Sequence, residues 1–324
     1  MNRIVVFLAV LIGLATSSQA QTSQIATLLH KGEVNFFYGS QALNKAVEAA
    51  DSGDVITLSP GQFDAVTSGK NGVLKNGLTI RGAGMGLPCG EVSNIPSEIV
   101  GNQNLENYAV NFENVVFKNE VSLTRSKTPL NFYKCTLNSL NVTGTGSSFT
   151  SDVTLVNSYV INKISRGTTS GWLKLTAVNS VIGDVESGPE SSFQNCILNN
   201  ISQAAGSQQF VNCVLGNVPG SVENLSFNYC VVLGTTVNPF ESQDGLINTN
   251  SAFNGTPYVE GSFYELSDGL KALSSSDDTQ IGIYGGNIGF SPIPSNPRIT
   301  KFNVAPKTSP DGKLSIDIEV AGVE

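Results

Sequence analysis

A short motif recurs along residues 112–232 of this 324-residue chain, and it limits the possible folds more than any other feature. Each copy has an apolar residue, any residue, usually Asn, and then Cys, Ser or Val, with another apolar residue two positions later. Successive copies begin at intervals of 16 to 23 residues, at Phe112, Phe132, Leu155, Ala177, Phe193, Phe210 and Phe227. Such a period without helical spacing is typical of a solenoid that adds one coil per repeat.

Strand geometry predicts what each position of the motif does. Side chains alternate between the two faces of a strand, so the first apolar residue points inward and its successor points outward. Asn tolerates left-handed backbone angles and is expected at the bend, which gives a ladder at Asn157, Asn179, Asn195 and Asn212. Stacked coils lie about 4.8 Å apart, so the small residues that follow form an interior ladder at Cys135, Cys196, Cys213 and Cys230.

The chain has five cysteines, and the ladder argues against a disulfide framework. A buried free cysteine behaves as a small apolar residue. Cysteines on neighbouring rungs could pair only with strained geometry. We therefore expect the four ladder cysteines to be unpaired, while Cys89 lies outside the ladder in a Gly-rich segment.

The N-terminus has the pattern of a secretory signal peptide. Arg3 provides a short basic start, an apolar run extends from Ile4 to Ala15, and small residues lead to Ala20. A membrane span needs roughly 20 apolar residues, and this run is shorter. We expect residues 1–20 to be removed and the protein to be exported to the periplasm, the cell surface or the medium, without spanning the membrane.

The net charge of the chain limits which molecules it is expected to bind. Without residues 1–20 the chain has 17 basic and 26 acidic residues, a net charge of −9. An acidic surface repels phosphate backbones, which excludes nucleic acid as a partner and also disfavours long polyuronate chains. Charged residues make up only 14% of the chain, and the many Gly, Asn, Ser, Thr and Val residues favour a β protein.

The motif resembles the coils of the pectate-lyase-like superfamily of right-handed parallel β-helices. Residues 40–54 are similar to the N-terminal capping helix of such proteins, and residues 264–286 are similar to the segment that closes them. The resemblance implies an all-β solenoid over residues 21–290 with a cap helix at about 40–51. It implies no single function, because the superfamily includes lyases, hydrolases, epimerases, adhesins and inactive members.

Residues 291–324 are expected to form a separate C-terminal β-hairpin tail. Three prolines precede two alternating segments, 298–304 and 313–320, and a turn signal lies at 309–312. Two strands alone are barely stable in water, so the tail should pack on the solenoid. The solenoid also has an outward apolar row that needs a cover, for which we expect the tail or residues 236–265: Tyr159, Val181, Ile197, Val214 and Val231.

An enzymatic function is one hypothesis. Lyases of this superfamily typically bind Ca²⁺ through acidic residues and use Lys or Arg to remove a proton beside a uronate carboxyl group. The repeat has no ladder of acids, and the main charged neighbourhood contains Lys163, Arg166 and Lys174, with Asp152, Asp184, Glu186 and Glu190. The three basic residues are the catalytic candidates, and Ca²⁺ is required only if the protein is such a lyase. No segment matches a polygalacturonase-type hydrolase, and no His or Cys pattern predicts another metal site.

The second hypothesis is a protein that binds without catalysis. Trp172 is the sole tryptophan. Because sugars usually dock on exposed aromatic rings, Trp172 is the candidate ligand-binding residue. The alternative, given equal weight, is that its ring fills a gap in the core. We favour an exported, non-catalytic protein that contacts a glycan or another cell-surface component. The alternatives are a polysaccharide lyase with an unrecognised site and an adhesin or self-assembling surface scaffold.

Overall fold

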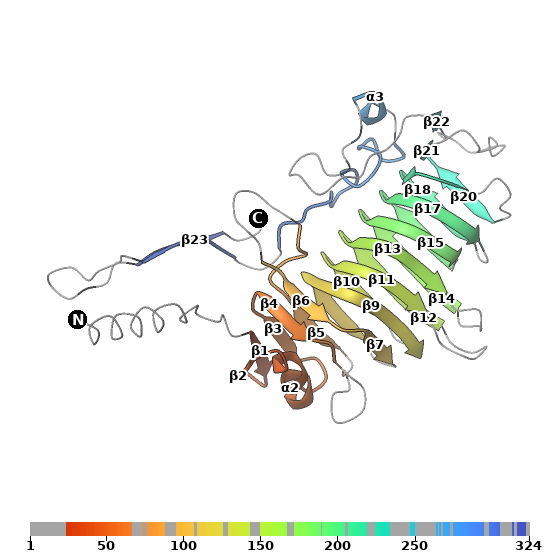
Figure 1. The fold of residues 1–324 in the computed structure, drawn as a ribbon. Coiled ribbons are helices and arrows are strands. Elements are labelled where there is room, and N and C mark those ends of the chain that lie inside the picture. The colour runs from red at the N-terminus through yellow and green to blue at the C-terminus, as the bar shows by residue number, and fades with distance from the viewer. Residues whose placement is uncertain are drawn as a thin grey trace, which may run out of the picture.

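The structure is a parallel β-solenoid with a short helix at its N-terminal end (Figure 1). It is a computed structural model that describes residues 24–66, 74, 77–87, 95–106, 109–125, 129–142, 150–166, 172–188, 190–204, 207–218, 224–233, 247–249, 264, 266, 268–272, 275–294, 298–304, 313 and 316–321. Over these residues, no helix is both long enough and apolar enough to span a membrane.

Two long sheets form the walls of the solenoid. Sheet A contains, in spatial order, β2 (Glu33–Tyr38), β1 (Ile25–His30), β3 (Val55–Leu58), β5 (Leu78–Arg81), β8 (Val110–Glu113), β10 (Leu130–Tyr133), β12 (Thr150–Val156), β14 (Trp172–Val178), β16 (Glu190–Gln194), β18 (Gln208–Val211) and β20 (Leu225–Asn228). Sheet B contains β22 (Ile247–Thr249), β21 (Val231–Leu233), β19 (Val214–Leu215), β17 (Ile197–Ala204), β15 (Val181–Gly188), β13 (Tyr159–Arg166), β11 (Thr136–Val142), β9 (Val115–Arg125), β6 (Ser97–Val100) and β4 (Gly61–Asp64), with β7 (Gln103–Glu106) beside β9. From β3 onward, the pairings in sheet A are parallel, as are those in sheet B.

From β8 to β21, a left-handed backbone residue connects the two sheets in each coil. The chain leaves a strand of sheet A, bends sharply and enters a strand of sheet B. The bend residues have φ between 45° and 56°, at Asn114, Lys134, Asn157, Asn179, Asn195, Asn212 and Tyr229. Asn accepts these angles more readily than most residues, which explains its recurrence in the motif.

The interior is built from ladders of like residues. The rings of Phe193 and Phe210 stack with centroids 5.0 Å apart, and those of Phe210 and Phe227 stack 5.1 Å apart. The four cysteines of the motif are buried free thiols, as the repeat predicts. Burial raises the pKa of the Cys135 thiol to about 12, so this sulfur is protonated at neutral pH and contributes to the core as an apolar group.

Phe210 should be one of the most important residues for stability. We expect Phe210→Ala to lower the free energy of unfolding by about 3–5 kcal/mol, because it leaves a cavity between two stacked rings. Chemical denaturation followed by circular dichroism measures the change. The neighbouring exposed Gln209→Ala is the control and should change stability by less than about 0.5 kcal/mol. Equal effects of the two substitutions would contradict the stack's role.

A helix and a hairpin close the N-terminal end. Helix α2 (Ala42–Ala49) buries Ala42, Leu43, Ala46 and Val47, and β1 and β2 form an antiparallel hairpin beside it. The cap helix predicted at about 40–51 therefore exists. A second short helix, α3 (Asp268–Lys271), lies near the other end.

The outward apolar row of sheet B is covered, but mainly not by the predicted segments. Val181, Ile197, Val214 and Val231 are buried against Met85, Leu266, Ile281, Ile283 and Phe290, with Tyr159 packed at the edge. Most of the cover thus comes from residues 264–294, which we call the closing segment. Of the predicted cover 236–265, only Tyr264 is a described residue of this cluster. Pattern alone could not choose among the segments that follow the last coil.

The side chains of the bend residues hold the closing segment in place. The Asn179 side chain donates hydrogen bonds to the carbonyls of Ile283 (2.8 Å) and Gly285 (2.7 Å). Lys134 and Asn195 likewise donate from their side chains to the carbonyls of Ile293 and Gln280. The side-chain oxygens of Asn157 and Asn212 instead accept hydrogen bonds from the backbone N–H groups of Ser291 and Ser276. A Cβ on Gly285 would overlap the carbonyl oxygen of Gln280 and the amide of Asn195, so only glycine allows this approach.

The Asn179 bonds can be tested with a substitution that preserves the bend. Glycine tolerates positive φ, so Asn179→Gly removes the amide without straining the backbone. It leaves two carbonyls unpaired, at a cost of about 1–3 kcal/mol for each buried group left without a partner. We expect faster limited proteolysis within residues 264–294, read by mass spectrometry. The exposed Asn217→Ala is the control, and equal cleavage rates in the two variants would refute the docking role.

The C-terminal tail forms a hairpin of its own. Strands β23 (Arg298–Val304) and β24 (Ile316–Ala321) pair antiparallel with each other in a separate two-stranded sheet. The hairpin confirms the sequence prediction for this region, while its packing on the solenoid stays a prediction.

Candidate functional site

The charged neighbourhood expected from the sequence divides between two faces of the solenoid. Lys163 lies on β13 in sheet B, whereas Lys174 lies on β14 in sheet A. The structure therefore does not bring these two candidate catalytic residues together. Each has acids on the adjacent strands of its own sheet: Asp184 and Glu186 accompany Lys163, and Asp152 and Glu190 accompany Lys174. The sequence separates Lys163 from Lys174 by only 11 positions, but β13 and β14 belong to different sheets.

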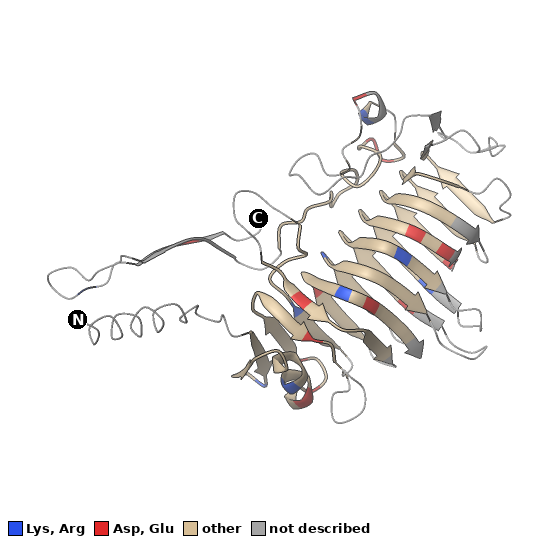
Figure 2. Ribbon diagram, viewed as in Figure 1, with Lys and Arg blue, Asp and Glu red and all other residues tan. Residues whose placement is uncertain are grey.

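The sheet B group is a mixed-charge cluster (Figure 2). The Lys163 Nζ atom lies 2.8 Å from Glu186 Oε2, and both side chains are partly exposed. Glu120 on β9 accepts hydrogen bonds from Ser122 and, at 3.4 Å, from Asn141. The cluster has more acids than bases, so its field repels an anionic ligand.

Lys163 is poorly suited to remove a proton. Its hydrogen bond to Glu186 and the charge of that carboxylate raise the pKa of the Lys163 amine, with smaller contributions from Glu120 and Asp184. A catalytic lysine base needs a lowered pKa so that the neutral amine is populated near neutral pH. Across the described residues, no three His, Cys, Asp or Glu side chains are grouped closely enough to hold a metal ion.

Sheet A presents a different surface, a row of uncharged polar side chains. The residue before the first apolar position of each repeat lies on the outer face, and register aligns Thr79, Asn111, Asn131, Thr154, Thr176, Ser192, Gln209 and Ser226. We call this set the neutral row. The motif contains this polar position in each repeat, but a search for charged and aromatic side chains does not find it.

At the N-terminal end of the neutral row, side chains hydrogen-bond to one another. Farther along the row, the described side chains do not. Asn131 donates to Asn111 at 2.8 Å, and Asn111 donates to Thr79 at 3.4 Å. Among the described residues, the side chains of Thr176, Ser192 and Gln209 have no hydrogen-bond partner. The open half of the row can therefore bind a ligand without breaking existing bonds.

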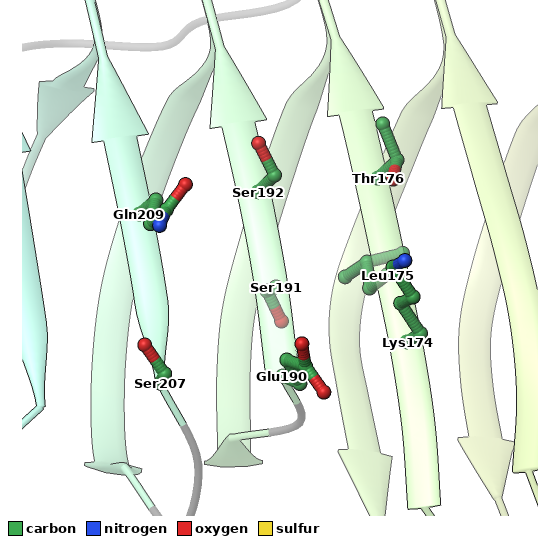
Figure 3. A pocket seen from close by; sticks show the side chains of 8 residues that line it. All are labelled: Lys174, Leu175, Thr176, Glu190, Ser191, Ser192, Ser207 and Gln209. Carbon is green, nitrogen blue, oxygen red and sulfur yellow. The ribbon is translucent and has the colours of Figure 1, made fainter.

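A small pocket lies over this open half (Figure 3). It has a volume of about 140 Å³ and is lined by Lys174, Leu175, Thr176, Glu190, Ser191, Ser192, Ser207 and Gln209. Lys174 and Glu190 occupy adjacent strands in register and are exposed. The pocket is smaller than the roughly 300–1,000 Å³ of a typical small-molecule site, so it is too small to enclose a ligand of that size.

Two predicted site residues have side chains outside the described part of the structure. The backbone of Arg166 ends β13 beside Val142, and the backbone of Trp172 begins β14 beside Thr150. Arg166 therefore shares sheet B with Lys163, and Trp172 shares a strand with Lys174.

Comparison of the chain with protein-family models, curated proteins and solved structures found no match.

The pairing of Lys163 with Glu186 predicts a measurable titration. In Glu186→Gln, we expect the pKa of the Lys163 amine to fall toward its ordinary value, because the carboxylate that favours the charged form is gone. Nuclear magnetic resonance of side-chain-labelled lysine measures this shift. Glu190→Gln on sheet A is the matched control and should leave the Lys163 pKa unchanged. A similar fall in both variants would mean that the pair does not form in solution.

Proposed function

We propose that this protein is an exported, non-catalytic binder of an extended neutral glycan, which it contacts along the outer face of sheet A. The observation that carries the proposal is the neutral row with its open half over β14, β16 and β18. Export rests on the signal-peptide pattern of residues 1–20.

The chemistry of the pocket suits sugar hydroxyl groups. Hydroxyls of Thr176, Ser192 and Ser207 and the amide of Gln209 can each donate and accept hydrogen bonds. Lys174 supplies only donors, and the Glu190 carboxylate supplies only acceptors. A sugar ring carries several hydroxyls that both donate and accept, so it can satisfy this mixed set.

The geometry favours a chain over a single sugar. The neutral row runs along the solenoid axis in steps of about 4.8 Å, one per coil. A polymer lying along the axis would repeat its contacts from strand to strand, while the pocket holds one unit. The expected net charge of −9 and the excess of acids in the mixed-charge cluster on sheet B favour a neutral polymer over a uronan.

Two observations weigh against the lyase alternative. Lys163 and Lys174 lie on different faces, and the raised pKa of Lys163 opposes its use as a base. The resemblance of the repeat to the pectate-lyase-like superfamily still supports a carbohydrate as the ligand class, because many of its members act on or bind polysaccharides.

Affinity electrophoresis tests the proposal directly. Gels containing neutral polysaccharides should retard the wild-type protein, and uronan gels should not. Ser192→Arg fills the pocket and should abolish the retardation. Asn199→Arg makes the same charge change at an exposed site on sheet B and should retain it, while Trp172→Ala shows whether binding extends to the start of β14.

Two results would contradict the binding proposal. One is equal retardation of Ser192→Arg and wild type in every gel. The other is release of unsaturated product from a uronan in the presence of Ca²⁺, seen as ultraviolet absorbance, which would establish a lyase.

A further inference from the structure

The N-terminal edge of sheet A exposes an apolar strand. In the described part of the chain, β2 pairs with β1 on one side and with no strand on the other (Figure 1). Val34, Phe36 and Tyr38 alternate along its outer face and are 52%, 57% and 58% exposed. Phe37, between them, packs against the core. Leu29 on β1, opposite Val34 and 48% exposed, extends the patch.

The backbone of β2 is also open at these positions. Lys31 and Gly32 have φ of 50° and 84° and form a two-residue turn between His30 and Glu33. The pair that flanks such a turn is hydrogen-bonded, and bonded pairs alternate along an antiparallel ladder. The amide and carbonyl groups of Val34, Phe36 and Tyr38 therefore point away from β1, toward the open edge.

This edge lacks the usual protection against strand pairing. Edge strands are generally blocked by lysine, proline, a bulge or an inward-pointing charge. Strand β2 contains no lysine or proline and pairs with β1 in unbroken register. Its single charged residue, Glu33, lies at the end next to the turn.

We propose that β2 pairs antiparallel with β2 of a second copy of this chain, about a two-fold axis at Phe36. In this register Phe36 lies opposite Phe36 of the partner subunit, and Val34 lies opposite the partner's Tyr38. These are the residues whose backbone groups are open, so the same register forms the ladder bonds and buries the exposed side chains. Glu33 falls outside the paired stretch, and no like charges meet.

A second copy fits this edge better than another occupant. A two-fold interface must be self-complementary, and the apolar residues are placed symmetrically about Phe36. A glycan or lipid could cover the side chains but would leave the strand's open backbone groups without a regular partner. Pairing of identical strands satisfies both.

The dimer has a consequence that rests on the proposed glycan function. An axis perpendicular to the sheet keeps the outer faces of both copies on the same side. The two neutral rows would then lie on one continuous face and could bind one polymer twice, which increases avidity. Dimer formation itself rests only on β2.

Light scattering during size-exclusion chromatography tests the dimer. We expect twice the chain mass for wild type and a single chain mass for Phe36→Lys. Ile161→Lys is the matched control, since Ile161 is a 45% exposed apolar residue on β13, and it should remain dimeric. Phe36→Pro should also be monomeric, because it removes an N–H that points away from β1 and leaves the β1–β2 bonds intact. Circular dichroism confirms that each variant is folded.

A cross-linking experiment reports the register and does not depend on weakening the interface. Directly opposite residues in a bonded antiparallel pair have Cα atoms about 5.5 Å apart, close enough for a short bis-maleimide to join two cysteine side chains. Phe36→Cys treated with this reagent should therefore form a covalent dimer in high yield. The parent protein, treated identically, should not, and Ile161→Cys should not. A monomeric wild type, a dimeric Phe36→Lys, or equal cross-linking of Phe36→Cys and Ile161→Cys would each overturn the proposal, whatever the result in glycan gels.

Discussion

The left-handed bend between the two sheets is the constraint on which the rest of the structure depends. A non-glycine residue in this conformation costs roughly 1–2 kcal/mol relative to a right-handed one, and the solenoid repeats it in successive coils. Asn lowers that cost, and its amide then hydrogen-bonds the closing segment, as Asn179 does with Ile283 and Gly285. The same residue thus turns the coil and fastens the segment that covers the apolar row of sheet B.

A constant bend also keeps the coils in register, and register determines which surfaces exist. Inside, it stacks Phe193, Phe210 and Phe227 and leaves the cysteines as buried thiols. Outside, it aligns the neutral row on sheet A and the mixed-charge cluster on sheet B. A solenoid of this kind has separate faces with separate chemistry, and residues close in sequence can face opposite directions.

The N-terminal end of the solenoid is only partly covered. At one end, α2 buries its apolar side against the core, but the adjacent hairpin leaves β2 with an exposed apolar face and an open backbone edge. We interpret this edge as a self-association surface. Together with the neutral row, it describes a protein whose function depends on extended surfaces rather than on a deep site, since the pocket over β14 to β18 is small.

The sequence by itself determined the solenoid, the bend residues and the unpaired cysteines, because each depends on local periodicity and on the preferences of single residues. The hairpin of the tail and the cap helix were predictable for the same reason. Only the tertiary structure decided that Lys163 and Lys174 lie on different sheets, because consecutive strands of a coil belong to opposite walls and residue spacing alone does not show where one strand ends and the next begins. It also decided that residues 264–294 cover the apolar row and that Thr176, Ser192 and Gln209 align, since these depend on contacts between segments far apart in the chain.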